Sequence, residues 1–129
     1  MTTKPQIAGE RRPNFRRYIA FEEKYGVTIV RINARRIDAQ VYEDVFTELV
    51  KLVEKVQPKK LLLNLTGVHY IYSTALSRLI TLHKKIKAYK GELRLCALED
   101  EVEELFEITQ LKKLFDIRKD EPTAHEKFW

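Results

Sequence analysis

The sequence of 129 residues predicts a single α/β domain, with a mixed β-sheet, an N-terminal hairpin and helices packed mainly on one face. Three patterns support this prediction. Residues 61–65 form a short, almost continuously apolar run, as in a strand that is covered on both faces. Amphipathic segments of helical period precede and follow this run. Two β-rich segments lie nearer the N-terminus, with a short turn sequence between them.

The two β-rich segments are residues 18–22 and 27–32. Both are rich in β-branched and aromatic residues, and Lys24, Tyr25 and Gly26 lie between them. A glycine within so short a connection is typical of an antiparallel hairpin. We therefore expect the domain to begin with a hairpin.

We expect the first helix to begin near Ala39 and to end before Pro58, because proline disfavours a helical conformation in the residue before it. Asp38 immediately precedes this segment and is the predicted N-cap, since its carboxylate can accept from free backbone N–H groups of the first turn. The apolar residues recur at helical spacing and are expected to face the core. They are Val41, Val45, Leu49, Leu52, Val53 and Val56.

The central strand is expected at residues 61–65, and residues 66–72 are expected to form a short loop that leads into a second helix. The apolar period changes from Leu76 onward, which indicates that this helix opens at Ser73. Its predicted inner face carries Leu76, Leu79, Ile80, His83 and Ile86.

Ser73 stands at or beside the N-cap of the second helix. A hydroxyl there can accept a hydrogen bond from the first turn, and the same free N–H groups, together with the helix dipole, favour an anion. A phosphate on Ser73 or Thr74 would be stabilised there and would add roughly two negative charges to the surface. The alternative, in which Ser73 only caps the helix, remains open.

Lys90 and Gly91 mark the end of the second helix, and residues 92–98 are expected to form another strand. Asp100 and Glu103 have the spacing of a capping box for a short third helix. Its inner face would carry Val102, Leu105, Phe106 and Ile108, and a last helical turn and a short closing strand would hold Leu111, Leu114, Phe115 and Ile117.

The alternation of strands and helices from residue 60 onward implies parallel neighbours joined by right-handed crossovers. Beyond Arg118 the composition turns polar, and we expect poor order out to Trp129. The predicted division is thus a basic N-terminal tail at residues 1–17, the domain at residues 18–118 and a polar C-terminal tail at residues 119–129.

The net charge of +5 is concentrated in the N-terminal tail, where Lys4 and four arginines stand against Glu10. This balance of +4 leaves +1 for the other 112 residues, so the domain lacks the basic stripe of a specific nucleic-acid-binding protein. No apolar run approaches the roughly 20 residues that span a bilayer, and the N-terminus has no apolar signal core. We therefore expect a cytoplasmic protein without a specific nucleic-acid or membrane partner.

Residues that commonly carry catalysis are scattered in this sequence. The four glycines form no phosphate-binding loop, and the three histidines lack metal-ligand spacing. His83 is expected to be a core histidine with satisfied hydrogen bonds, and Cys96, the single cysteine, an inert buried thiol. No serine stands in a nucleophile elbow. The sequence thus favours a binding module over an enzyme, without a cofactor or a metal.

Several separated segments resemble the STAS domain, the fold of bacterial anti-sigma factor antagonists, over about residues 18–118. Residues 34–38 (Ala-Arg-Arg-Ile-Asp) are similar to the Gly-x-Leu-Asp signature that follows the second strand of the family. Residues 71–76 (Ile-Tyr-Ser-Thr-Ala-Leu) resemble its Asp-Ser-Ser/Thr-Gly-Leu loop. Residues 90–93 and 105–111 are similar to the start of its last strand and to its third helix.

The resemblance implies a protein that switches partners. In the family, the first hydroxyl of that loop, which matches Ser73, is phosphorylated by a serine/threonine kinase that is itself the anti-sigma factor; Thr74 is the neighbouring acceptor. Binding of the unmodified protein to this kinase would free a sigma factor. The aspartate that matches Asp38 contributes to the kinase interface. The expected contact residues are Asp38, Tyr72, Ser73, Thr74, Ala75 and Arg78.

Three residues depart from the family pattern: Tyr72 replaces an acidic residue, Ala75 a glycine and Asn64 a common aspartate. Tyr72 makes the loop more apolar, which favours an alternative: a STAS scaffold subunit of a larger signalling or lipid-transport assembly that is never phosphorylated. A third alternative is a regulator that binds a small ligand or nucleotide, although no phosphate-binding motif supports it. Whether the protein forms a homodimer is also open.

Overall fold

The structure of the protein is a computed structural model, which describes residues 17–126 and residue 128 of the chain. The predicted basic tail, apart from Arg17, lies outside the described residues, as do Lys127 and Trp129.

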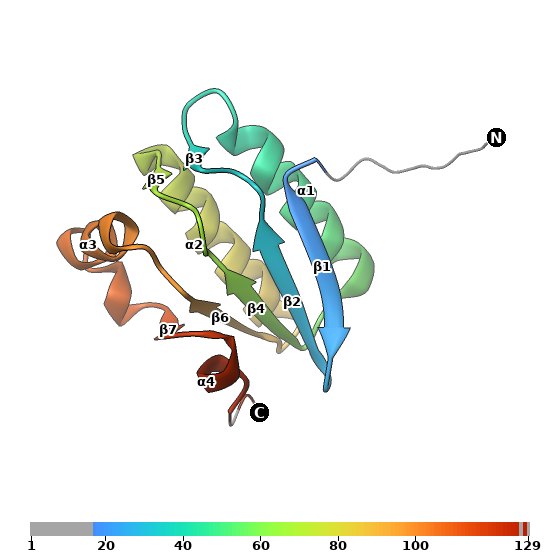
Figure 1. Ribbon diagram of the computed structural model, residues 1–129. Coiled ribbons are helices and arrows are strands. Elements are labelled where there is room, and N and C mark those ends of the chain that lie inside the picture. The colour runs from blue at the N-terminus through green and yellow to red at the C-terminus, as the bar shows by residue number, and fades with distance from the viewer. Residues whose placement is uncertain (1–16, 127, 129) are drawn as a thin grey trace.

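A five-stranded mixed sheet forms the centre of the fold. Its strands are β1 (Ile19–Lys24), β2 (Val27–Ile32), β4 (Lys60–Asn64), β6 (Glu92–Cys96) and β7 (Asp116–Arg118). In space they lie in the order β1-β2-β4-β6-β7 (Figure 1), with β1 antiparallel to β2 and the other neighbours parallel. β4 holds the middle position and its leucines are at most 1% exposed, which confirms the predicted central strand.

The predicted hairpin is confirmed, with a tighter turn than expected. Lys24 pairs with Val27, so only Tyr25 and Gly26 form the loop. Their φ angles are 54° and 80°, as in the type I′ turn whose twist matches that of the flanking strands. Gly26 adopts this conformation without steric cost, and Tyr25 leaves its ring exposed to solvent.

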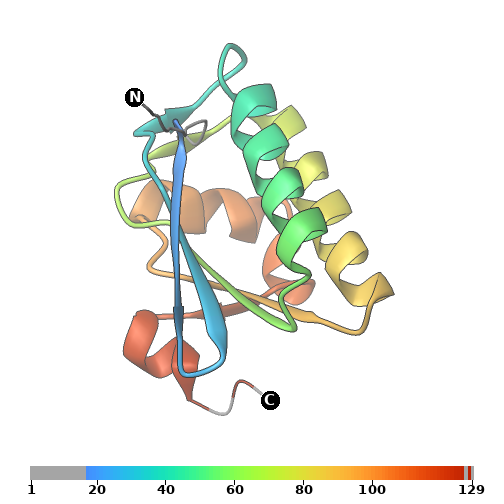
Figure 2. The same ribbon diagram turned by 90° about the vertical axis from the view of Figure 1, so that its right-hand side faces the viewer.

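Two helices, α1 (Tyr42–Val56) and α2 (Ser73–Ala88), lie side by side on one face of the sheet (Figure 2). The buried residues of α1 recur at helical spacing, and they are Val45, Phe46, Leu49, Leu52 and Val53. Those of α2 are Ala75, Leu76, Leu79, Leu82 and Ile86. The predicted inner faces of the two helices are therefore correct for most residues. In α1, Val56 is 36% exposed; in α2, Leu82 is fully buried, whereas His83 is only partly buried.

α1 begins at Tyr42, later than the predicted start near Ala39, and Asp38 does not cap it. The Oδ1 atom of Asp38 accepts from the backbone N–H groups of Gln40 and Val41, at 3.0 and 3.2 Å, in a turn that precedes the helix. Short acidic side chains bond readily to backbone groups two residues on, and this local turn competes with a helical start.

The third helix, α3 (Asp100–Ile108), lacks the predicted capping box between Asp100 and Glu103, because Glu99 is the N-cap residue and no side-chain cap bond forms. The carboxylate of Glu99 instead accepts from the backbone N–H of Gly67, at 2.7 Å. The acidic residues of the first turn still favour the helix through its dipole. The side chain that would cap the helix thus fastens a distant loop.

The inner face of α3 is only partly as predicted. Val102 and Phe106 are buried, whereas Ile108 is 72% exposed because it stands at the end of the helix, beyond the edge of the core. A last helical turn, η1 (Leu111–Lys113), leads to β7, as predicted.

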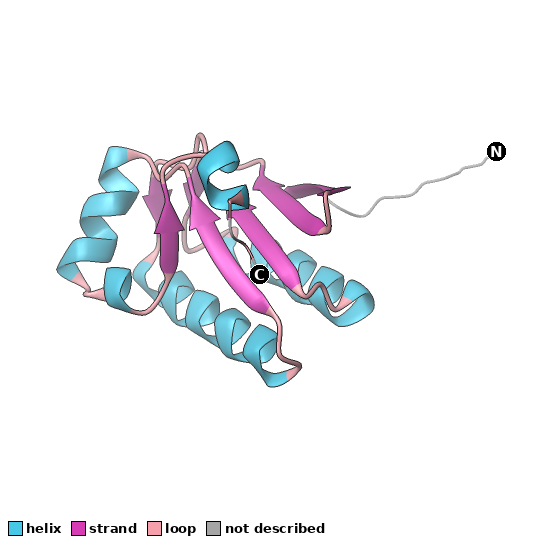
Figure 3. Cartoon of the chain, turned by 90° about the horizontal axis from the view of Figure 1, so that it is seen from below, coloured by secondary structure: helices cyan, strands magenta, loops and turns pink. Residues whose placement is uncertain are grey.

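The expectation of poor order beyond Arg118 is wrong for the described residues 119–126 and 128. A short helix, α4 (Glu121–His125), lies against the sheet face opposite α1 and α2 (Figure 3). Ala124 and Phe128 are fully buried. They pack with a second apolar cluster of sheet residues, Val27, Ile29, Leu62 and Cys96. Two apolar side chains in a polar stretch form no period, so this docking left little trace in the sequence.

Arg94 on β6 fixes the C-terminal segment, which we define as residues 120–126 and 128. Its Nη1 donates to the carbonyl oxygens of Ala124 and Glu126, at 2.6 and 2.8 Å, and its guanidinium lies 4.4 Å from the centroid of the Phe128 ring. Its Nε pairs with Asp116 at 2.9 Å. This buried charge is therefore compensated by a carboxylate and by carbonyl groups.

We predict that Phe128→Ala lowers the free energy of unfolding by about 3 kcal/mol, because it leaves a cavity under the C-terminal segment. Urea unfolding measures this change. Ile108→Ala is the matched control: it removes an exposed apolar side chain and should change stability by less than about 0.5 kcal/mol. Equal effects of the two substitutions would contradict the burial of Phe128.

Candidate functional site

A second, two-stranded sheet brings the starts of α1 and α2 together. β3 (Arg36–Ile37) and β5 (Tyr70–Ile71) pair in parallel, with Ile37 opposite Ile71. The ladder continues at its end, where the N–H of Tyr72 donates to the carbonyl oxygen of Ile37 at 2.7 Å. Asp38 follows Ile37 and Ser73 follows Tyr72, so both residues flank the same end of this ladder.

Ser73 is the first residue of α2, and its side chain is exposed. Tyr72 is the N-cap residue, and the helix has no side-chain cap hydrogen bond, so the suggested capping role of the Ser73 hydroxyl is wrong. Ser73 is instead an exposed residue at the positive end of the helix dipole. This position leaves it accessible for modification and favourable for an anion.

The face of α2 toward α1 carries a stack of side chains. The rings of Tyr72 and Tyr42 lie 5.4 Å apart, and the guanidinium of Arg78 lies 5.4 Å from the Tyr42 ring centroid. Arg78 also pairs with Glu43 at 2.9 Å. Aromatic contacts and a cation–π contact hold these side chains in place although they remain partly exposed.

On the other side of Ser73 lies a cavity of about 300 Å³ between β5 and α3. Its lining comprises His69, Tyr70, Ile71, Tyr72, Ser73, Glu101, Val102 and Leu105. At its rim the Nδ1 atom of His69 lies 3.3 Å from the carboxylate of Glu101. Hydrogen bonds from its own backbone and from His69 lower the pKa of Glu101, so this rim carries a negative charge at neutral pH.

Sequence reasoning missed this cavity and the aromatic residue beside it. The guanidinium of Arg36 lies 4.3 Å from the ring centroid of Tyr70, which is 38% exposed. Tyr70 fell within the predicted loop of residues 66–72, and Glu101 had no predicted role. Strands of two residues are too short to show an alternating pattern, so the sequence pattern did not predict the pairing of residues 36–37 with residues 70–71.

Most of the predicted contact residues share this surface. Tyr72, Ser73 and Thr74 are at least partly exposed at the start of α2. Arg78 lies in the second turn of the same helix and is also partly exposed. Ala75 is fully buried in the core, so in this structure its side chain offers no surface for a direct contact. Its small side chain instead lets the first turn of α2 approach the core closely.

In the described part of the chain, no three or more His, Cys, Asp or Glu side chains group as a metal site would require. Burial raises the pKa of the Cys96 thiol to about 12, which keeps it protonated and unreactive. None of the helices in that part is long and apolar enough to span a membrane.

His83 differs from the expectation of a satisfied core histidine. Its Nδ1 is buried and has no hydrogen-bond partner among the described residues, and its ring packs against Phe115 at 5.2 Å. Burial, together with the nearby charge of Lys87, lowers the pKa of His83 and keeps the imidazole neutral at physiological pH. It lies on the half-buried side of α2 and takes no part in the surface around Ser73.

Comparisons with known proteins agree on the family. The model of the STAS domain matches residues 18–124. A relative from Bordetella bronchiseptica, BtrV, named as a candidate anti-sigma factor antagonist, is 30% identical over 86 residues, which cover 67% of this chain and 73% of the relative.

Two solved structures share the fold. One is a candidate anti-sigma factor antagonist from Thermotoga maritima, with a TM-score of 0.77, 17% identity and coverage of 88% of this chain and 96% of that one. The other is the Bacillus cell fate determinant SpoIIAA in its phosphorylated form, with a TM-score of 0.59, 11% identity and coverage of 81% and 94%. Since the family model also matches most of the sequence, this chain belongs to the STAS domain family.

Proposed function

We propose that the protein is a non-enzymatic anti-sigma factor antagonist, and that phosphate on Ser73 controls its binding to an anti-sigma factor serine/threonine kinase. The observation that carries this proposal is the exposed hydroxyl of Ser73 on the first residue of α2, beside Asp38. Thr74, also exposed, is the second candidate acceptor. A kinase that controls a sigma factor works in the cytoplasm, so the proposal includes that location.

The surroundings of Ser73 support a protein partner. Tyrosine and arginine are enriched at the centres of protein interfaces, and both residue types surround this hydroxyl. They are Tyr42, Tyr70, Tyr72, Arg36 and Arg78. Stacking already restrains these side chains, so their immobilisation in a complex costs less conformational entropy.

Phosphate on Ser73 would oppose such a complex. It adds roughly two negative charges to a surface that the partner covers. A charge that is buried in an interface without a counter-charge is strongly unfavourable. The rim of the adjacent cavity is already negative at Glu101, and the free N–H groups of the first turn of α2 offset only part of the added charge. Modification would therefore release the kinase.

The relatives support this function by their names. BtrV is named as a candidate anti-sigma factor antagonist, and SpoIIAA has been solved in a phosphorylated form. SpoIIAA shares the fold of this chain at low sequence identity, so its phosphorylation is a precedent within the fold. The choice of Ser73 as the acceptor rests on the residues of this chain.

One observation favours a second candidate function, a STAS scaffold that is never phosphorylated. Tyr72 occupies the position before the acceptor, and its ring packs on Tyr42. The residue before Ser73 thus offers a kinase no negative charge, and the stacked rings suit a permanent apolar contact. Incubation with ATP and candidate kinases, followed by mass spectrometry, separates the two functions: a phosphate at Ser73 supports the switch, and an unlabelled protein in a stable complex supports the scaffold.

We predict that Ser73→Ala removes most labelling while it preserves the kinase complex, because the substitution deletes the acceptor without adding charge. Ser73→Asp should weaken the complex by at least about tenfold, since it places a negative charge in the contact. Thr74→Ala is the matched control and should retain most labelling. Equal affinity of the alanine and aspartate variants for the kinase would show that the interface lies elsewhere.

We further predict that Asp38→Asn weakens the kinase complex by about threefold to tenfold and leaves the melting temperature nearly unchanged. The asparagine Oδ1 can still accept from Gln40 and Val41, so the turn before α1 survives while the charge is lost. Asp44→Asn, which removes an exposed charge from the first turn of α1, is the control. Titration calorimetry measures the affinities; identical effects of both variants would exclude a specific role for Asp38.

A further inference from the structure

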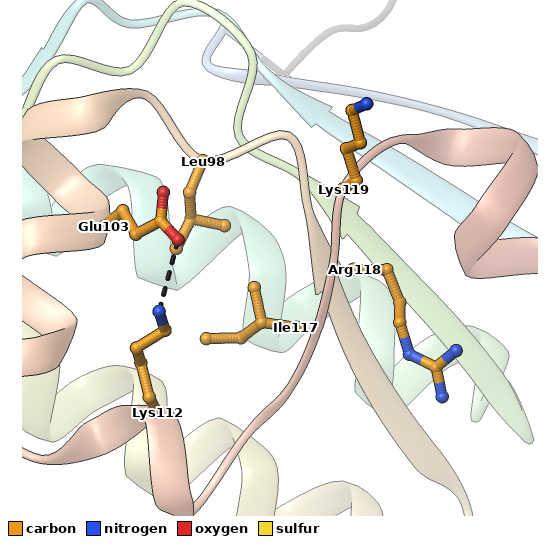
Figure 4. A pocket seen from close by; sticks show the side chains of 6 residues that line it. All are labelled: Leu98, Glu103, Lys112, Ile117, Arg118 and Lys119. Carbon is orange, nitrogen blue, oxygen red and sulfur yellow. Dashed lines mark hydrogen bonds and ion pairs between the residues drawn. The ribbon is translucent and has the colours of Figure 1, made fainter.

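Several cavities and clusters lie away from Ser73. One cavity of about 310 Å³ is bordered by Lys112, Arg118 and Lys119 (Figure 4), but Lys112 is paired with glutamates and Arg118 with Asp116. These cations are compensated, and in Figure 4 the side chains of Arg118 and Lys119 diverge instead of converging on a ligand. A different cluster, around Asn64, connects the C-terminal segment with the candidate site.

Asn64, at the C-terminal end of β4, joins two parts of the chain that are distant in sequence. Its side chain lies in the interior, with 8% of the residue exposed. Its Nδ2 donates to Oε2 of Glu121 in the first turn of α4, and its Oδ1 accepts from the N–H and the hydroxyl of Thr66, at 2.8 and 2.6 Å. One amide group thus uses its donor on the C-terminal segment and its acceptor on the loop that leads to Ser73.

Glu121 is anchored independently of this contact. Its two carboxylate oxygens accept from Nε and Nη2 of Arg31 on β2, at 3.0 and 2.9 Å. Burial alone would raise the pKa of Glu121, but the hydrogen bonds from Asn64 and Arg31 outweigh burial and lower it, so the carboxylate is charged at neutral pH. The side chain at position 64 must therefore present a donor to Glu121 and an acceptor to Thr66, which an amide does.

The loop of residues 66–69 runs from Asn64 to β5 and so to Ser73. At its far end the N–H of His69 donates to the carbonyl oxygen of Arg35, at 2.7 Å, which fastens it to the β3 side. At its near end the Asn64 side chain holds the first residue of the loop. Between these anchors the N–H of Gly67 donates to the carboxylate of Glu99 at 2.7 Å, so the Asn64 contact acts together with this bond in setting the geometry with which the chain enters β5.

We propose that Asn64 is a positioning residue through which docking of the C-terminal segment fixes the loop of residues 66–69 and hence the presentation of Ser73. This inference rests on the proposed function. To phosphorylation it adds a second control of the Ser73 surface, namely docking of the C-terminal segment. When the segment is docked, Glu121 polarises the Asn64 amide and strengthens its hold on Thr66. When the segment is released, that polarisation is lost and the loop loosens without any change at Ser73 itself.

The first test is Glu121→Ala in the full-length protein, followed by amide hydrogen exchange. We expect exchange at Thr66 to rise about fivefold, although no hydrogen bond joins Glu121 to Thr66. Glu126→Ala is the matched control, because it removes an exposed carboxylate of the same segment that has no contact with Asn64, and it should leave Thr66 unchanged. Faster exchange in α4 with unchanged exchange at Thr66 would overturn the coupling.

The second test reverses the polarity of the contact. Asn64→Asp places a carboxylate against Glu121 and should raise exchange in both segments by about tenfold at neutral pH, with less effect at about pH 4, where the pair shares a proton. The double variant Asn64→Asp, Glu121→Gln again sets a donor against an acceptor at position 64, although it leaves Arg31 one acceptor instead of two, so it should restore slow exchange at Thr66 in part. A double variant no more protected than Asn64→Asp would overturn the proposal.

Ser73 labelling by an anti-sigma kinase provides a separate readout. If the unsubstituted protein is not labelled, the proposed function fails, while the exchange data still decide whether Asn64 couples the two segments. If it is labelled, we expect kcat/KM for phosphorylation of Asn64→Asp to change by at least about threefold and to recover in the double variant. Unchanged labelling despite a loosened loop would overturn the role of Asn64 in presenting Ser73.

Discussion

The parallel ladder between β3 and β5 is the contact on which the candidate site depends. It pairs only two residues on each side, yet it joins the turn before α1 to the first residue of α2. Without it, Asp38 and Ser73 would lie on two separate loops, and the tyrosines and arginines around them would not be held in fixed positions relative to one another. The buried side chains of Ile37 and Ile71 fasten this small sheet to the core, so stability of the core and geometry of the site are linked.

The two faces of the main sheet serve different purposes. α1 and α2 cover one face with two complete apolar stripes and set the direction in which Ser73 points. The opposite face is covered by the C-terminal segment, where Phe128 and Ala124 supply the apolar contact and Arg94 and Glu121 supply directional polar contacts. This cover depends on few apolar residues and on a small set of directional polar contacts, and elements held in this way commonly open locally at lower cost than the whole domain.

The helices and strands that follow from the pattern of apolar residues were predicted from the sequence. Features that depend on contacts of single residues were mostly not predicted. Repeating apolar positions located α1 and α2, a continuous apolar run located the central strand, and the Ser73 loop was found by resemblance to a family. The start of α1 was misplaced because the turn made by Asp38 competes with a cap, and the capping box of α3 failed because Glu99 bonds to Gly67 instead. α4 and the cavity beside Ser73 depend on tertiary contacts of individual residues such as Phe128 and Tyr70, which carry no period.

In the proposed switch, phosphate on Ser73 changes the surface charge of the domain and leaves its fold intact. Repulsion of phosphoserine 73 by Asp38 would amount to about 1 kcal/mol across a partly solvated gap, and attraction by the free N–H groups of α2 would be of similar size. The most direct test compares the melting temperature and the kinase affinity of the phosphorylated and unmodified proteins. We expect melting temperatures within about 3 °C and affinities that differ by more than about tenfold. A phosphorylated form that melts many degrees lower would show that the switch works by local unfolding.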